Sequence, residues 1–77
     1  MHSPTVVLYT RVGCHLCDQA KALLLRHGLE PQEVDIDHNA GLREKFDHCV
    51  PVVEIDGKIR FRGRIDEVLL RRLLPTR

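Results

Sequence analysis

The sequence predicts one α/β domain over residues 1–77, in which strands and helices follow the order β-α-β-α-β-β-α. Two patterns lead to this fold class. Strand-like apolar runs alternate with helical patterns in the first half, and an Asp-Gly turn joins two further strands near the end. The third observation is length, because so short a chain buries only roughly 60% of its unfolded surface and has room for one core. We therefore expect a single domain whose functional site lies on one surface.

The first strand and helix are marked by a change in the apolar pattern after residue 10. Residues 5–10 are mostly β-branched, apolar or aromatic without polar alternation, which is typical of a strand covered on both faces. From Cys14 onward apolar residues recur at helical spacing, and Gly28 stands where a helix commonly ends. The recurring residues are Leu16, Ala20, Leu23 and Leu24. This segment is predicted to be a strand followed by an amphipathic helix.

The second half contains a further strand and helix, then a hairpin and a last helix. Residues 32–37 alternate polar and apolar side chains as a strand does, and Asn39 can cap a helix that runs through Phe46. Asp56 and Gly57 separate two β-rich runs, which is a strong hairpin signal. The hairpin strands are predicted at 52–55 and 58–62, and the last helix has its apolar stripe at Ile65, Val68, Leu69 and Leu73.

The connections between these elements predict how the sheet is assembled. A right-handed crossover through the first helix would place the first two strands parallel, and the hairpin would complete a mixed four-stranded sheet. Because the first strand is apolar on both faces, helices must cover both faces of the sheet. The pattern alone therefore predicts a thioredoxin-like architecture.

Composition narrows the class of protein. Hydrophobic residues make up 43% and charged residues 30% of the chain, and no apolar run approaches the ~20 residues that span a bilayer. Residues 1–5 show no secretory signal, so we expect a cytoplasmic protein with no membrane partner. Its three cysteines cannot all pair within one chain, which indicates reactive rather than architectural thiols.

Charge is distributed unevenly along the chain. Residues 1–57 hold five Lys and Arg against nine Asp and Glu, whereas residues 58–77 hold seven against two. A basic surface can attract nucleic acid, but only three aromatic residues are present for stacking on bases. We therefore interpret the basic segment as a solvated face, expect no nucleic-acid partner, and expect a monomer.

Cys14 and Cys17 form the motif that carries chemistry. Residues three apart in a helix lie on the same side at a spacing that a disulfide can bridge. Cys14 stands in the first turn, where unpaired backbone N–H groups and the helix dipole favour a thiolate. A thiol of pKa ~8.5 is a few per cent ionised at pH 7, and one lowered to ~7 is about half ionised. We expect Cys14 to be the nucleophile and Cys17, one turn deeper, to be the resolving thiol.

A metal-binding module is the alternative to redox chemistry. Cys14, Cys17, His48 and Cys49 are four soft ligands of the kind used by a tetrahedral zinc site, and a copper or iron–sulfur site is a variant. A copper-chaperone-like domain also has two such cysteines after its first strand, but it ends on a strand. This chain is predicted to end on a helix.

The motifs around the cysteine pair resemble those of the glutaredoxin family. The similarity covers about residues 5–74 and includes residues 9–17, 34–37, 50–53 and 55–57, in the family's order and spacing. It is nearest to short bacterial glutaredoxin-like proteins with two cysteines separated by two residues. The resemblance implies a cis-proline at Pro51 facing the active cysteine, and a Val50 backbone that pairs with an extended thiol substrate. It also implies that Arg11 meets a glutathione carboxylate.

Three departures from the family pattern concern substrate binding. The family's Gly-Gly before the last helix is Gly63-Arg64 here, so Arg64 either crowds a substrate backbone or offers it a charge, while Asp66 keeps an acidic position for binding. His15 next to Cys14 either stabilises the thiolate or is inert. Cys49 replaces a threonine and either captures glutathione, forms another disulfide, joins a metal site or is inert.

These residues together predict a thiol-disulfide oxidoreductase that cycles the Cys14/Cys17 pair through a mixed disulfide. The expected partner is a disulfide-bearing protein or glutathione, the latter as a co-substrate. We expect no tightly bound cofactor. The sequence does not choose between these substrates.

Overall fold

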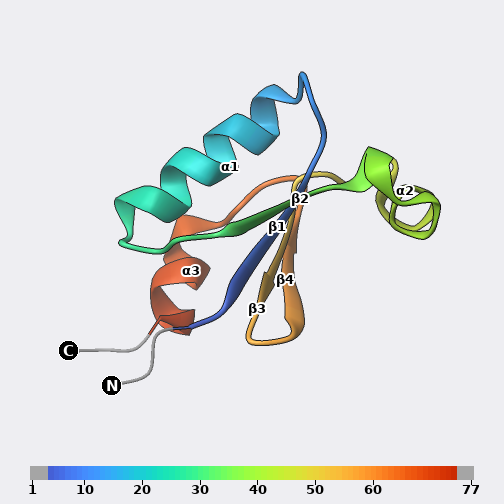
Figure 1. The fold of residues 1–77 in the computed structure, drawn as a ribbon. Coiled ribbons are helices and arrows are strands. Elements are labelled where there is room, and N and C mark those ends of the chain that lie inside the picture. Colours follow the sequence, from blue (N-terminus) through green and yellow to red (C-terminus); the bar gives the residue numbers. More distant parts are fainter. Residues whose placement is uncertain (1–3, 75–77) are drawn as a thin grey trace.

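A computed structural model describes residues 4–74 of the chain (Figure 1). Residues 1–3 and 75–77, which the predicted domain included, lie outside the described part. The elements are β1 (Val6–Thr10), α1 (His15–Arg26), β2 (Gln32–Asp35), the short 3₁₀ helix η1 (Ile36–His38), α2 (Ala40–Phe46), β3 (Val52–Ile55), β4 (Lys58–Arg62) and α3 (Glu67–Leu73). The predicted order β-α-β-α-β-β-α is confirmed, with η1 as an addition.

The four strands form one mixed sheet in the order β2-β1-β3-β4. β1 pairs parallel to β2 and antiparallel to β3, and β3 pairs antiparallel to β4. Tyr9 near the end of β1 lies opposite Val52 at the start of β3. Because these neighbours run in opposite directions, the loop that leaves β1 and the loop that enters β3 meet at one edge of the sheet. This topology brings the segment of Cys14 and the segment of Pro51 to the same end of the molecule.

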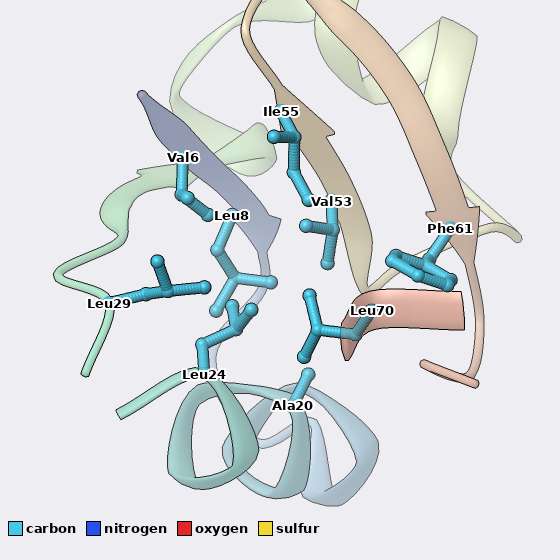
Figure 2. Packing of buried hydrophobic residues seen from close by; sticks show 9 residues of the cluster. All are labelled: Val6, Leu8, Ala20, Leu24, Leu29, Val53, Ile55, Phe61 and Leu70. Carbon is cyan, nitrogen blue, oxygen red and sulfur yellow. The ribbon is translucent and has the colours of Figure 1, made fainter. Parts of the chain in front are cut away.

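Helices cover both faces of the sheet, as the apolar first strand predicts. α1 and α3 lie on one face, where Leu24 of α1 and Leu70 of α3 point toward Leu8 of β1 (Figure 2). These three leucines have no exposed surface, and full burial of such a side chain contributes roughly 1.5–3 kcal/mol. The whole buried cluster on this face is Val6, Leu8, Ala20, Leu24, Leu29, Val53, Ile55, Phe61 and Leu70.

α2 lies on the opposite face, beside the end of β1 (Figure 1). Its Phe46 is 2% exposed and packs with Ile36 and Val52 into a second buried cluster. The rings of Tyr9 and Phe46 are 4.9 Å apart between centroids, a distance typical of a favourable aromatic pair. Tyr9 and Leu8 contact different clusters because successive side chains of a strand point to opposite faces.

β2 is shorter than the sequence predicts. It ends at Asp35 rather than at residue 37, and the chain turns into η1. The carboxylate of Asp35 accepts a hydrogen bond of 2.9 Å from the backbone N–H of Asp37, which stabilises this turn. Residues 32–37 alternate polar and apolar side chains, which predicted a strand through Ile36. Ile36 lies in η1 instead and is fully buried in the second cluster.

The predicted turn and cap residues have the expected local geometry. Asn39 accepts a 3.0 Å hydrogen bond from the backbone N–H of Leu42 and caps α2, as predicted. Asp56 and Gly57 have φ angles of 51° and 83°, the left-handed values that a tight two-residue hairpin turn requires. Within residues 4–74, no helix combines the length and the apolar character needed to cross a membrane.

Candidate active site

Cys14 is the residue that caps the N-terminus of α1. Its Sγ accepts a 3.1 Å hydrogen bond from the backbone N–H of Cys17 and is bonded to the Cys17 sulfur in a disulfide. The two Cα atoms are 5.2 Å apart, within the range that a disulfide prefers. When the disulfide is reduced, the same N–H and the positive end of the helix dipole would favour a thiolate at Cys14.

The two sulfurs differ in their access to solvent. Cys14 is partly exposed at the start of α1, whereas Cys17 is 2% exposed. Gly13 has a φ angle of 80°, and the N–H of Cys14 donates to the carbonyl of Arg11. This tight turn places Cys14 at the N-terminus of α1. A side chain at position 13 would strain the turn, because its φ angle is positive. The arrangement suits an accessible attacking sulfur and a protected partner.

The segment before β3 lies at the same sheet edge as the cysteines. The Val50–Pro51 peptide bond is cis, the form that the family resemblance implies, and Pro51 is buried. The N–H of Gly63 donates to the carbonyls of Cys49 and Pro51 at 3.1 and 2.8 Å, so the end of β4 holds this segment. Among residues 4–74, no other backbone group bonds to the Val50 N–H or C=O. The Val50 backbone therefore makes no backbone hydrogen bond within this part of the chain, and its pairing with a substrate stays a prediction.

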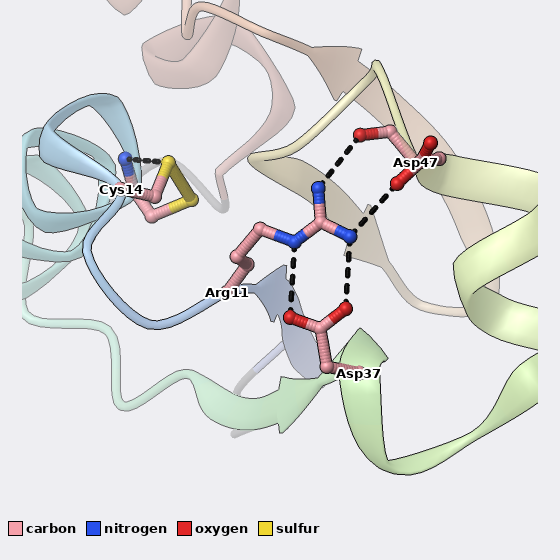
Figure 3. The surroundings of a disulfide bond; sticks show 5 residues. Arg11, Cys14, Asp37 and Asp47 are labelled. Atoms are coloured by element: carbon pink, nitrogen blue, oxygen red, sulfur yellow. Dashed lines mark hydrogen bonds and ion pairs between the residues drawn. A yellow bond between two sulfur atoms is a disulfide. The ribbon is translucent and has the colours of Figure 1, made fainter.

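Arg11 is engaged by two aspartates of the chain (Figure 3). Its Nε and Nη2 donate to the two carboxylate oxygens of Asp37 at 3.0 and 2.8 Å. Nη2 also donates to the Asp47 carboxylate at 2.8 Å, and Nη1 donates to the Asp47 carbonyl at 3.1 Å. Sequence reasoning placed Arg11 against a substrate carboxylate and missed both aspartates. Asp37 stood inside a predicted strand, so its proximity to Arg11 had no signal in the sequence.

Hydrogen bonding sets the charge states of this cluster. The guanidinium of Arg11 lowers the pKa of Asp37 and the pKa of Asp47, mainly through the hydrogen bonds that it donates. The same bonds raise the pKa of Arg11 above its already high ordinary value. All three groups are charged at neutral pH, so the cluster carries two negative charges and one positive charge. Arg11 thereby ties the loop before Cys14 to η1 and to the end of α2.

Arg64 lines a small cavity between α1 and the loop from β4 to α3. The cavity has a volume of about 220 Å³. Its lining residues are Leu16, Gln19, Ala20, Leu23, Gly63, Arg64 and Ile65. Arg64 is exposed, and its guanidinium has no hydrogen-bond or ion-pair partner among residues 4–74. Leu16 stands between the two cysteines in the sequence, but neither cysteine lines the cavity.

Asp66 is the N-cap of α3. Its Oδ1 accepts hydrogen bonds from the backbone N–H groups of Val68 and Leu69, at 3.0 and 3.2 Å. Asp66 was predicted to bind substrate, and the cap is a structural role that sequence reasoning did not assign to it. Binding of substrate at Asp66 stays a prediction.

His15, His48 and Cys49 are not gathered into one site. His15 is exposed, and His48 is 93% exposed with Nε2 3.4 Å from an Asp47 oxygen. Cys49 is a free thiol, partly buried against the cluster of Ile36, Phe46 and Val52. In the part of the chain that the structure describes, no three His, Cys, Asp or Glu side chains lie close enough to hold a metal ion. The four ligands of the alternative metal site therefore do not converge in this conformation.

The fold and the cysteine pair define a glutaredoxin-like protein of the thioredoxin fold. Residues 5–75 match the family model "Glutaredoxin-like domain (DUF836)". The chain belongs to this family.

Known relatives and solved structures are consistent with this assignment. A glutaredoxin-like protein of Dictyostelium discoideum is 36% identical over 75 residues, which cover 84% of this chain and 69% of that protein. The solution structure of protein Ne2328 from Nitrosomonas europaea superposes with a TM-score of 0.80 at 26% identity, over 97% of this chain and 95% of the other. Glutaredoxin C1 from Populus tremula × tremuloides, in its holo form, superposes with a TM-score of 0.71 at 26% identity, over 91% and 71% of the two chains.

Proposed function

We propose that this protein is a dithiol-disulfide oxidoreductase in which Cys14 attacks and Cys17 resolves. The observation that carries the proposal is the Cys14–Cys17 disulfide at the N-terminus of α1, with one sulfur accessible and the other 2% exposed. Membership in a glutaredoxin-like family supports it.

In the reducing direction, the reaction begins with the Cys14 thiolate. It attacks one sulfur of a substrate disulfide, forms a mixed disulfide, and releases the other substrate sulfur as a thiolate that takes up a proton from solvent. Cys17 then loses its proton, and its thiolate attacks the Cys14 sulfur. The second substrate thiolate leaves, and the Cys14–Cys17 disulfide forms. Two electrons pass from the protein dithiol to the substrate.

The reverse steps regenerate the dithiol. A low-molecular-weight thiol such as glutathione attacks Cys14, Cys17 leaves as a thiolate, and a second thiol resolves the mixed disulfide. Two thiols are thus oxidised to one disulfide for each protein disulfide reduced. Glutathione is proposed here as a co-substrate of this step.

The structure supports these roles through position and hydrogen bonding. The Cys17 N–H, 3.1 Å from the Cys14 sulfur, remains a donor to a Cys14 thiolate in the reduced protein. Burial disfavours ionisation of Cys17 until a mixed disulfide offers it a target. The Val50 N–H and C=O, which make no backbone bond among residues 4–74, would pair with the backbone beside a substrate cysteine.

Titration against glutathione redox buffers tests the proposal. The ratio of dithiol to disulfide in the wild-type protein should follow the buffer with a two-electron dependence. Cys17→Ser should accumulate a glutathione mixed disulfide on Cys14, visible as a mass increase. Cys14→Ser should accumulate no adduct on Cys17, because that sulfur is buried, and Cys49→Ser serves as a control that should titrate as the wild type does. Failure of the wild-type pair to exchange with any thiol would contradict the proposal.

A further inference from the structure

A cluster of three charged side chains adjoins the loop that carries Cys14 (Figure 3). The N–H of Cys14 donates to the Arg11 carbonyl at 3.3 Å, so the backbone of Arg11 is tied to this cysteine. The Arg11 guanidinium, however, makes four hydrogen bonds to Asp37 and Asp47. A carboxylate on a substrate would have to displace one of these aspartates in order to pair with Arg11.

Displacement of either aspartate is unfavourable. Asp37 accepts two parallel hydrogen bonds from Arg11, the bidentate geometry that makes arginine–carboxylate pairs strong. The hydrogen bonds from Arg11 lower the pKa of Asp37 and the pKa of Asp47, so both remain charged at neutral pH. Because the aspartates belong to the same chain, their effective concentration at Arg11 is high, whereas a substrate arrives from dilute solution. Arg11 is therefore withheld from substrates.

The surroundings of the aspartates add negative charge. Asp35 lies next to Asp37 and accepts a hydrogen bond from its N–H, and Glu44 lines one hollow of the surface together with Arg43 and Asp47. This group has four carboxylates and, with the arginine that they hold, two guanidinium groups. The side chains of Asp37 and Asp47 are 39% and 42% exposed, so a molecule at the surface meets their charge.

The cluster joins the two segments that a substrate would contact. In the proposed function the substrate sulfur meets Cys14 and the substrate backbone pairs with Val50. Arg11 stands three residues before Cys14, and Asp47 stands three residues before Val50. The Nη2 of Arg11 lies 2.8 Å from an Asp47 carboxylate oxygen. The charges of the cluster therefore lie beside the path between the two substrate-contacting segments.

We propose that Asp37 and Asp47 are specificity-determining residues, which make the redox site discriminate against disulfides with a carboxylate near the reacting sulfur. They withhold Arg11 from the substrate, and their own charge opposes a further negative charge. The substrates favoured at this cluster are disulfides whose neighbouring groups are neutral or basic. The inference rests on the proposed function and narrows its substrate class. Glutathione can still react as the co-substrate, but its carboxylates gain no ion pair with Arg11.

Three small disulfides of equal length test the inference. 3,3′-Dithiodipropionate, 2-hydroxyethyl disulfide and cystamine have the same two-carbon spacer and end in a carboxylate, a hydroxyl and an ammonium group. Each oxidises the pre-reduced full-length protein, and the loss of protein dithiol gives a second-order rate constant. Each constant is divided by that of the neutral disulfide, because a change in folding or in cysteine reactivity shifts all three rates together.

The solution conditions isolate the charge of the aspartates. His38 and His48 lie 3.4 Å from Asp35 and Asp47 and would add positive charge if protonated. The reactions are therefore run at pH 8, above the ordinary titration range of histidine. The salt concentration is about 0.1 M, at which charges farther apart than about 10 Å are largely screened.

Conservative variants assign the discrimination to the two aspartates. Asp37→Asn and Asp47→Asn each keep an oxygen that can accept from Arg11 and remove one negative charge. Each should raise the dithiodipropionate ratio about threefold and lower the cystamine ratio about threefold, as for a partly exposed charge pair. Arg11→Gln should shift both ratios in the opposite direction, because it removes the positive charge of the cluster.

Glu30→Gln is the matched control. It removes one negative charge from an exposed residue that precedes β2, and β2 runs parallel to β1, whose far end leads to Cys14. Glu30 thus lies toward the opposite end of the sheet, and both ratios should stay within about 1.5-fold of the wild type because distant exposed charges are screened.

The outcomes separate this inference from the proposed function. In about 1 M salt the ratios of all variants should converge, because the Debye length falls to about 3 Å, and differences that persist there would overturn a charge effect. If Asp37→Asn and Asp47→Asn leave both ratios unchanged while all three disulfides react, the redox function stands and the inference is wrong. If Glu30→Gln shifts the ratios as much, total charge sets the preference and the inference is also wrong. If no disulfide reacts, the proposed function fails and the inference fails with it.

Discussion

Arg11 and Asp37 form a bidentate pair, in which Nε and Nη2 of the arginine lie 3.0 and 2.8 Å from the two carboxylate oxygens. The same Nη2 bonds to Asp47, two residues before Cys49. The pair therefore joins the loop that carries Cys14 to η1, and through Asp47 to the segment that leads to Pro51. Arg11 therefore holds together three segments that surround the redox site.

Removal of the Arg11 side chain should lower the thermal stability of the protein. Arg11→Gln leaves Asp37 and Asp47 facing each other without a shared cation, and we expect Tm to fall by roughly 2–4 °C. Thermal unfolding followed by circular dichroism measures this change. Arg60→Gln removes an exposed arginine with no ion pair among residues 4–74 and should leave Tm within about 1 °C. Equal shifts in both variants would show that Arg11 has no special structural role.

The same cluster predicts how stability depends on pH. Arg11 lowers the pKa of Asp37 and the pKa of Asp47 in the folded state, so their contribution is fully present above the unfolded value of about 3.9. It is lost as the pH falls through the lower folded values. The difference in unfolding free energy between wild type and Arg11→Gln should be constant from pH 5 to 7 and shrink below about pH 4. Urea titrations at several pH values measure it, and a difference that grows with acid would contradict this assignment.

Thiol reactivity should differ among the three cysteines, because Cys17 is buried and, of the two partly exposed cysteines, only Cys14 lies at a helix N-terminus. In the reduced protein near neutral pH, iodoacetamide should modify Cys14 at least about tenfold faster than Cys17 or Cys49, because Cys14 is accessible and its thiolate is favoured at the helix end. Mass spectrometry of peptides from timed reactions gives the three rates. Equal rates at all three cysteines would contradict the assignment of Cys14 as nucleophile.

Burial of Leu70 predicts a large effect from its truncation. Leu70 has no exposed surface and joins α3 to the sheet, so Leu70→Ala should cost about 3 kcal/mol of unfolding free energy. Leu69 is the preceding residue of the same helix and is 47% exposed. Leu69→Ala is therefore the matched control, with an expected cost under about 1 kcal/mol. Similar losses in urea unfolding would mean that α3 does not pack through Leu70.

Asp66 can be tested for capping and substrate binding at the same time. Asp66→Ala removes the acceptor of two backbone N–H groups and should cost about 1 kcal/mol, whereas Asp66→Asn keeps a capping oxygen and should cost little. If Asp66 also binds substrate through its charge, Asp66→Asn should lower the rate of disulfide exchange while leaving the unfolding free energy near that of wild type. Loss of stability in the Asn variant equal to that in the Ala variant would show that the cap depends on charge.

Much of the fold could be predicted because its signals are local. The Asp56-Gly57 turn, the Asn39 cap and the apolar residues of α1 each act within a few positions of the chain, and the structure confirms these elements. The end of β2 was predicted wrongly for a tertiary reason. Residues 32–37 alternate polar and apolar side chains as a strand does, but Ile36 is buried in a cluster with Phe46 of α2 and Val52 of β3, which the local pattern does not reveal.

The sequence by itself predicted the order of the elements and placed Cys14 and Cys17 within reach of each other, because residues three apart at the start of a helix lie on the same side. The structure joins these two cysteines in a disulfide. Only the tertiary structure decided which arginine is free. Arg11 and Arg64 were both predicted to bind substrate. The folded chain brings Asp37 and Asp47 to Arg11 from 26 and 36 residues away, whereas no carboxylate within residues 4–74 forms an ion pair with Arg64. An ion pair between residues far apart in sequence forms only when the fold brings their loops together, and a local sequence pattern does not show which loops will meet.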